Sequence, residues 1–315
     1  MTSAVGAAPV TGRSAALATS SRRRSHRVRR RRWLGLAYLA PVLAVYALVV
    51  IVPTGQTLWL SLYHWNGITV ARWAGLANYS SFLSDPQLRS AIAHTGVLLG
   101  FYAILPIALG LLSAALLTAR GLRGLGAFRT VIFLPQVLTS VVIAVVWRQI
   151  YAPDGPLDAG LRGVGLGSLA HDWLGSFTLA LPALGFVGTW STFGLCMVLF
   201  VSGVQSIPLE LFDAARVDGA GRVREFFAVT LPALRGPLAV ALTLTVIAGL
   251  RAFDIIWLTT RGGPGSATTT PAIELYSRAF IQSDVGAAAA VGVVLAVVSL
   301  AVALVIVRLS EGADQ

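Results

Sequence analysis

A chain of 315 residues that is 56% hydrophobic and only 12% charged is too apolar to fold around one water-soluble core, so most of it is expected in lipid. The net charge of +11 does not indicate a nucleic-acid-binding protein. Nine arginines and no acidic residue lie in residues 1–32, so the basicity belongs to a tail before an apolar run.

The N-terminal tail leads into the first apolar stretch. The first 20 residues of the tail are rich in Ala, Ser, Thr and Gly and are predicted to be disordered. A basic region before an apolar run also fits a signal peptide, but Trp33 to Val52 offers about 20 residues, enough to span a bilayer. We therefore expect an uncleaved first transmembrane helix.

Six apolar stretches follow one another along the chain. Each approaches or exceeds the ~20 residues that a helix needs to cross ~30 Å of hydrocarbon. Because none alternates as a barrel strand does, the predicted fold class is all-α, a polytopic membrane protein with six transmembrane helices. The predicted spans are Trp33–Leu58, Ala91–Leu117, Thr130–Trp147, Leu179–Ser202, Pro237–Trp257 and Val285–Val307.

The arginines orient these spans, since the chain contains no lysine. With the N-terminus in the cytoplasm, the inner segments carry seventeen arginines and the outer segments five. This excess predicts a multi-pass protein of the cell membrane with both termini in the cytoplasm. The expected organisation is a tail over 1–32, a transmembrane domain over 33–310 and a short cytoplasmic tail over 311–315.

Motifs of catalysis are missing from the sequence. The four histidines are scattered without metal-ligand spacing, and a phosphate-binding glycine loop would need a lysine. We expect no catalytic residue, no metal and no cofactor bound by this chain. If ATP and magnesium are used, another subunit must hold them.

The inner segment 208–237 differs from the rest of the chain. Pro208 can start a helix over 209–217, Asp218 and Gly219 indicate a turn, and a second helix is expected over 221–229, ended by Pro232 after Leu231. Small residues would let another backbone approach, and the charges could pair with a partner. An amphipathic helix lying on the membrane without a partner explains the pattern equally well.

This segment closely resembles the cytoplasmic EAA loop of binding-protein-dependent ABC importer permeases. Its positions match in order and spacing, although Asp213 stands where the family usually has glutamate. The resemblance implies a coupling helix that docks in a cleft of an ATPase subunit. The predicted coupling residues are Asp213, Ala214, Ala215, Asp218, Gly219, Ala220, Leu231 and Pro232.

Three further segments resemble the carbohydrate and glycerol-phosphate group of these permeases, and the F-type half of the maltose permease. They are 128–151, 253–265 and 276–289. The resemblance implies alternating access in a complex with a second, different permease subunit, an ABC ATPase dimer and an extracytoplasmic solute-binding protein. It also implies a sugar-type solute.

The solute path is expected inside the spans. Trp190, Ser191 and Thr192 form a polar and aromatic cluster at mid-span, which fits either a sugar site or hydrogen bonds between helices. Asp254 is a second candidate. It is also three residues from Arg251 and could share a helix face and an ion pair with it.

Two other classes of function fit the sequence less well. A self-sufficient secondary transporter predicts inverted repeats or carboxylates within the spans, and the sequence shows no clear repeat. A membrane scaffold that transports nothing leaves the inner segment unexplained.

Overall fold

The computed structural model describes residues 38–117 and 125–311, in two compact units, 1–56 and 57–315. The described helix of the first unit begins at Tyr38 and continues through η1 (Ala47–Ile51) and α2 (Val52–Leu60) into the second. No side chain of this helix is buried within the described structure. Residues 1–37 and 312–315, which include the predicted N-terminal tail and nearly all of the predicted C-terminal one, lie outside the described residues.

A small cap begins the second unit. Strands β1 (Tyr63–His64) and β2 (Arg72–Trp73) pair antiparallel, and α3 (Ala77–Ser84) follows them. The buried side-chain amide of Asn78 donates to two main-chain carbonyls of the segment around β1, at 2.8 and 3.0 Å. The carbonyl oxygen of Trp65 accepts from the start of α16, so the cap is tied to the last helix.

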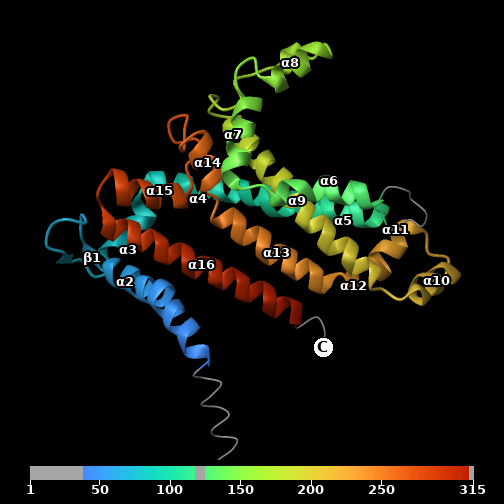
Figure 1. Cartoon of the computed structure of the whole chain (residues 1–315), viewed down its shortest axis with the longest axis horizontal. Coiled ribbons are helices and arrows are strands. Elements are labelled where there is room, and N and C mark those ends of the chain that lie inside the picture. Colours follow the sequence, from blue (N-terminus) through green and yellow to red (C-terminus); the bar gives the residue numbers. More distant parts are fainter. Residues whose placement is uncertain (1–37, 118–124, 312–315) are drawn as a thin grey trace, which may run out of the picture. The chain divides into compact units, whose positions relative to one another are not determined.

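Long apolar helices make up most of the second unit, and Figure 1 shows α13 and α16 lying side by side. Asp85 caps the first of them and Pro86 occupies its first turn, as expected for a helix start. The helices are α4 (Pro86–Leu99), η2 (Gly100–Ile104) and α5 (Leu105–Leu117), which form one rod, then α9 (Ala180–Gln205), α13 (Arg235–Leu250) and α16 (Val285–Glu311).

The predicted third span is not one helix. It consists of α6 (Leu125–Val137) and α7 (Ser140–Ile150), which meet at an angle of 100°. Thr139 has an extended backbone and caps α7 through its hydroxyl, which stops α6 from continuing. The described residues thus contain five helices long and apolar enough to cross a membrane, or six if the bent pair counts as one.

The predicted fifth span is also interrupted. Helix α13 ends at Leu250, and the short α14 (Asp254–Thr259) begins after three non-helical residues. A loop with buried threonines leads to α15 (Pro271–Tyr276) and η5 (Ser277–Ile281). The hydroxyl of Thr270 donates to the carbonyl oxygen of Ala252 at 2.8 Å, which holds this loop against the break.

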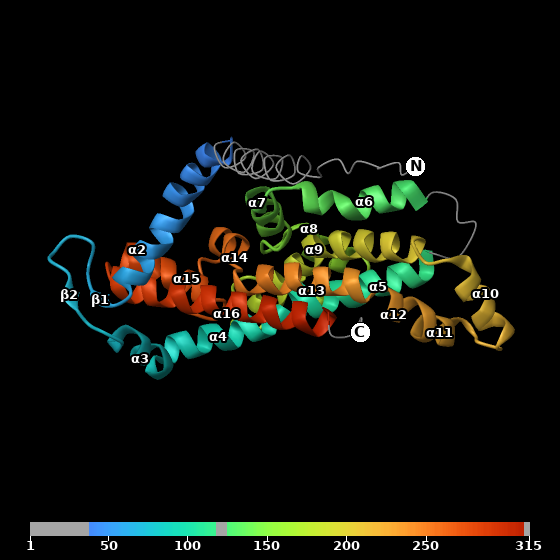
Figure 2. The ribbon, with the colours of Figure 1, turned by 90° about the horizontal axis from the view of Figure 1, so that it is seen from below.

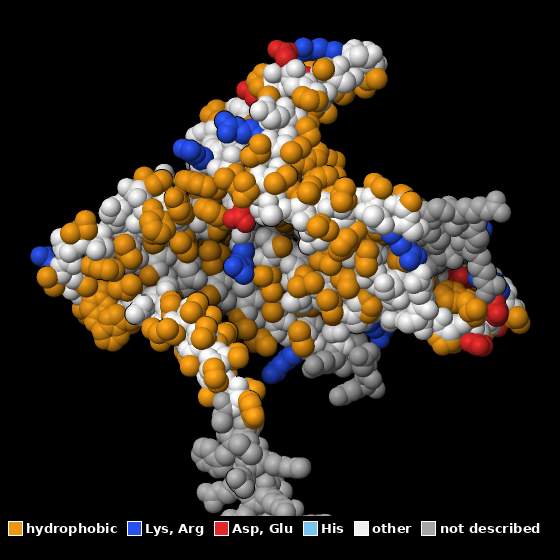
Figure 3. All heavy atoms as spheres, in the orientation of Figure 1, with side chains coloured by type: hydrophobic (Ala, Val, Ile, Leu, Met, Phe, Trp, Pro, Cys, Tyr) orange, Lys and Arg blue, Asp and Glu red, His pale blue; other side chains and the backbone are white. Residues whose placement is uncertain are grey.

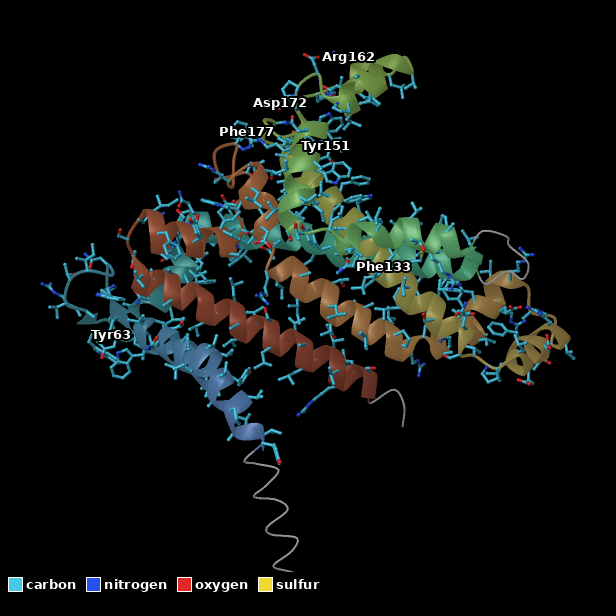
Figure 4. All side chains as sticks on the ribbon, in the orientation of Figure 1. Tyr63, Phe133, Tyr151, Arg162, Asp172 and Phe177 are labelled. Atoms are coloured by element: carbon cyan, nitrogen blue, oxygen red, sulfur yellow. The ribbon has the colours of Figure 1, made fainter. Side chains whose placement is uncertain are left out.

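A segment between α7 and α9 projects from the long helices and contains α8 (Pro156–Gly163) and η3 (Gly167–Leu169). Figure 4 shows Tyr151 near its base and Arg162 toward its far end. The Tyr151 hydroxyl donates to the carbonyl oxygen of Ala183 at 3.2 Å, and the Trp173 indole donates to buried Asp158 at 2.8 Å. These bonds give the projecting segment a fixed base and its own small core.

Two hydrophobic clusters form the core, and α9 contributes to both. One contains Leu98, Leu184 and Ile256 and lies toward the cap and α14. The other contains Phe200 and Leu234 and lies toward the inner segment. Figure 2 shows α9 running close to α5 and α13.

The contact between α9 and α6 requires a residue without a side chain. A Cβ on Gly194 would lie 2.4 Å from the carbonyl oxygen of Ile132 on α6. Only glycine lets the two backbones come this close.

Candidate functional site

The inner segment forms two helices joined by a tight turn, as its sequence predicts. They are α10 (Leu209–Val217), with the predicted bounds, and α11 (Arg222–Glu225). Helix α11 continues without a gap into η4 (Phe226–Thr230) and α12 (Leu231–Ala233). The expectation that Pro232 ends this helix after Leu231 is wrong, because the helical backbone runs through Pro232 to Ala233 and a turn follows at Leu234.

The turn after α10 is set by Gly219. Its φ of +77° lies in the left-handed region, which side chains disfavour. The N–H of Ala220 donates to the carbonyl of Ala215 at 2.9 Å, and the N–H of Gly219 to that of Arg216 at 3.0 Å. This pair of bonds is the Schellman motif, which gives the carbonyls of Ala215 and Arg216 partners at the end of α10.

An ion-pair network spans the turn. Arg216 donates from Nε and Nη2 to the two carboxylate oxygens of Glu225, at 3.0 and 3.1 Å, and from Nη1 to Asp213 at 3.4 Å. The hydrogen bond to Glu225 and the charges of Glu225 and Asp213 raise the pKa of Arg216. The sequence predicts that these charges pair with another protein, whereas in the structure Arg216 pairs with Glu225 and Asp213.

The helix–turn–helix at 208–237 is called the elbow below, and the predicted coupling residues are distributed over its outside. Asp213, Ala214, Asp218, Gly219 and Pro232 are exposed, and Ala215, Ala220 and Leu231 are half-buried. Phe212 and Val229 pack on the inner core cluster, which attaches the elbow to the long helices. Figure 3 shows acidic side chains gathered near α10 and near α8, while hydrophobic side chains cover much of the long helices.

A cavity of about 980 Å³ lies among α6, α7, α9, α13, α14, α15 and α16. Three of the predicted solute-path residues line it, Ser191, Thr192 and Asp254. The hydroxyls of Ser191 and Thr192 also donate to a carbonyl of their own helix, at 2.9 and 2.8 Å. Among the described residues that line the cavity, the predicted Trp190 is not present, and its ring instead packs edge-on against Trp147.

The cavity also has an aromatic wall that the sequence analysis did not identify. Phe253 and Tyr276 line it, with ring centroids 5.5 Å apart, and Trp257 stacks on Phe253 from behind. Phe253 lies in the non-helical break between α13 and α14, Trp257 lies on α14, and Tyr276 is the last residue of α15. No local sequence signal pairs them.

Arg251 and Asp254 both line the cavity, but the expected shared helix face is wrong. The first follows the end of α13 and the second begins α14, so a break separates them. Among the described residues, no ion pair joins these two side chains. The cavity wall therefore carries one positive and one negative group that are not neutralised by each other.

A second charge cluster fixes the start of α4 to η5. Arg278 pairs with Asp85 and, at 3.5 Å, with Glu274, and all three side chains are less than a third exposed. Burial opposes ionisation of Asp85, but the N–H of Gln87 and the guanidinium of Arg278 outweigh it and lower the pKa of that carboxyl. The sequence does not predict this cluster, because Asp85 is far from Glu274 and Arg278 along the chain.

Residues 106–313 match the family model described as "Binding-protein-dependent transport system inner membrane component". The chain belongs to this family. The match includes the elbow and most of the cavity, and it identifies the chain as a permease subunit of a binding-protein-dependent ABC importer. The self-sufficient transporter is thereby disfavoured.

The descriptions of similar proteins agree with this family. The diacetylchitobiose uptake system permease protein NgcF of Streptomyces coelicolor is 33% identical over 89% of this chain and 83% of that protein. The trehalose/maltose transport system permease protein MalF of Thermococcus litoralis is 32% identical over 88% and 94%. A solved bacterial ABC transporter for alginate import has the same fold, with a TM-score of 0.77 at 22% identity over 91% and 98% of the two chains.

Proposed function

We propose that this chain forms half of the translocation path of a sugar importer, with ATP hydrolysed by a separate ATPase dimer. A second permease subunit completes the path, and an extracytoplasmic binding protein delivers the solute. The observation that carries this proposal is the elbow at 208–237, a preformed helix–turn–helix with exposed small and acidic residues. Both termini and the elbow are on the cytoplasmic side, in keeping with the arginine distribution.

Helix α10 is the element that binds the ATPase in this proposal. Ala214 gives close backbone approach, Asp213 offers a charged contact, and Gly219 sets the angle of α10. Closure of the ATPase dimer on ATP moves α10, and the bundle opens outward. The ATPase must hold the two states of the bundle with different affinity, since equal affinity would shift nothing.

The cavity is the solute site. Its volume of about 980 Å³ is at the upper end of ordinary ligand pockets, which suits a sugar of one or a few units. Aromatic faces from Phe253 and Tyr276 suit the apolar faces of a sugar ring, and Gln136 and Ser140 add groups that bond hydroxyls. Several relatives carry sugar names, among them those for diacetylchitobiose and trehalose/maltose, which supports this class.

The coupling role is tested by a pull-down from native membranes with two aspartate variants. Gly219→Asp forces a side chain onto a φ of +77°, whereas Gly221→Asp adds the same charge two residues on, at a φ of −72° and in the N-cap position, which aspartate favours. Neither glycine has a neighbour within 4 Å of its would-be Cβ, so the backbone angle is the difference. We expect the first variant alone to lose the ATPase subunit.

Two results would overturn the proposal. One is a wild-type chain that purifies alone and moves solute into liposomes without ATP. The other is equal retention of the ATPase subunit by both variants, which would remove the elbow from the coupling interface.

The solute site is tested by uptake of labelled mono- and disaccharides in liposomes that hold the whole complex. Tyr276→Ala removes a cavity-lining ring and is expected to reduce uptake, whereas Phe280→Ala removes a ring from the same aromatic group outside the cavity lining. Equal uptake by both variants, or uptake of no sugar by the wild type, would contradict a sugar site in this cavity.

A further inference from the structure

The Arg216–Glu225 pair is not needed to form either helix that it joins. Helix α10 is closed by its own Schellman motif, and α11 starts at Gly221 with an extended backbone. The pair instead connects one helix to the other across the turn, with both hydrogen bonds of a planar fork. A bidentate arginine–carboxylate pair fixes direction as well as distance.

The turn itself is a weak mechanical link. It contains two glycines, Gly219 and Gly221, in four residues, and a Cβ at either one would meet open space. Backbone of this kind has many accessible conformations. A displacement applied to α10 would be absorbed there if nothing else linked α10 to α11.

Glu225 lies in the first turn of the continuous helical segment that runs from Arg222 to Ala233. Its side chain is 17% exposed, against 52% for Arg216. From Glu225, helical backbone continues through η4 and α12 to α13, interrupted only by a turn at Leu234. Thr230 and Leu234 are buried along this route, so it is anchored in the inner core cluster.

The contact of Arg216 with Asp213 is of a different kind. It is a single bond at 3.4 Å to a side chain that is 64% exposed, on the same helix. Asp213 therefore keeps an oxygen free of Arg216 for another protein, while Glu225 is fully engaged.

We propose that Arg216 and Glu225 are positioning residues that stiffen the turn between α10 and α11. Because the pair spans the turn, a movement of α10 reaches α13 rather than bending the elbow. Neither residue needs to touch the ATPase for this role. The inference rests on the proposed coupling function of α10 and adds the route by which movement enters the bundle.

The test uses the complete complex in liposomes and measures both ATP hydrolysis and solute import. The variants are Arg216→Glu, Glu225→Arg and the double variant that combines them, called the double exchange. A further variant, Glu225→Gln, removes the charge but keeps the shape of the side chain, so it still tests the pair if the charge reversals do not fold. Arg224→Glu is the matched control, an exposed arginine on α11. Thermal unfolding and the amount of bound ATPase are measured for each variant.

We expect each single variant to lower the solute imported per ATP hydrolysed by about threefold, the scale of losing one partly exposed charge pair. Bound ATPase and unfolding temperature should stay at wild-type values, and the double exchange should recover import. A merely structural pair would change the unfolding temperature and leave the import-to-hydrolysis ratio intact.

Two outcomes would overturn the inference while the coupling function stands. If the double exchange imports no more solute per ATP than the worse single variant, the two side chains do not act by pairing with each other. If single variants lose the ATPase, these charges contact the ATPase directly. A wild-type complex that imports without ATP would instead overturn the coupling function itself.

Discussion

Gly194→Ala should separate helices α9 and α6, and the size of the effect follows from the structure. The added Cβ would lie 2.4 Å from the carbonyl oxygen of Ile132 and 2.9 Å from the Cα of Phe133. Both are main-chain atoms, so no rotamer change relieves the clash. Ordinary contact begins near 3.4 Å, so α6 must retreat by about 1 Å.

The energetic cost is estimated from two opposing effects. Overpacking a tight contact costs about 1–3 kcal/mol, and the clash with main chain belongs at the upper end. Replacing a helical glycine by alanine returns about 0.5–1 kcal/mol. The net loss is about 2 kcal/mol, which lowers the unfolding midpoint of a domain of this size by about 4–8 °C.

The assay is thermal unfolding of the purified chain in detergent. Solute uptake is measured in parallel in liposomes that hold the whole complex. Uptake should also fall, because α6 carries Pro135 and Gln136 in the cavity wall. Gly126→Ala is the control on α6, where the new Cβ meets nothing within 4 Å. If both variants unfold at the same temperature, the reasoning from close backbone approach is refuted.

Two further predictions concern the cap and the start of α4. Because Asp85 has a lowered pKa, its ionised form stabilises the fold fully above pH 3.8 and this stabilisation is lost as the pH falls below it. Asp85→Asn should therefore lower stability by about 1–2 kcal/mol at pH 7 and by less at pH 3. Asn78→Leu leaves the carbonyls of Ser61 and Tyr63 without this donor and should cost about 2 kcal/mol in unfolding by denaturant.

Each of these has its own control. Asp218→Asn removes an exposed carboxylate and should leave the stability profile against pH unchanged. Gln87→Leu makes an exposed amide apolar and should leave the unfolding free energy close to wild type. A pH-independent loss for Asp85→Asn would exclude the ion pair with Arg278 as its cause, and a neutral Asn78→Leu would exclude the two hydrogen bonds.

Sequence patterns predicted helix ends where a particular residue forces one. Pro208 and Gly219 bracket α10, because a proline starts a helix readily and glycine adopts the positive φ at its end with the least strain. The same reasoning was wrong at Pro232, because the helical backbone, with a π-helical turn before it, runs through this proline to Ala233.

The cavity could not be predicted in the same way. Hydropathy records how apolar a stretch is but not its direction. Pro135 indicates a kink in the run from Thr130 to Trp147, but neither the end of the helix at Val137 nor the angle of 100°. The aromatic wall pairs Phe253 with Tyr276 through two breaks in helical structure. The charge pairs of Arg216 and Arg278 likewise depend on which helices meet, which a single sequence does not state.

The bend between α6 and α7 lies at the wall of the cavity. Helix α6 stops at Val137 and α7 restarts at Ser140, so the main-chain groups at the break do not bond as they would in a continuous helix. The Thr139 hydroxyl accepts from one of the first amides of α7, and the N–H of Leu138 donates to the carbonyl of Pro135. Gln136 and Ser140, on either side of the break, line the cavity. If the cavity holds the solute, as proposed, the peptide groups at this break are hydrogen-bonding groups that an alanine scan of the wall would leave in place.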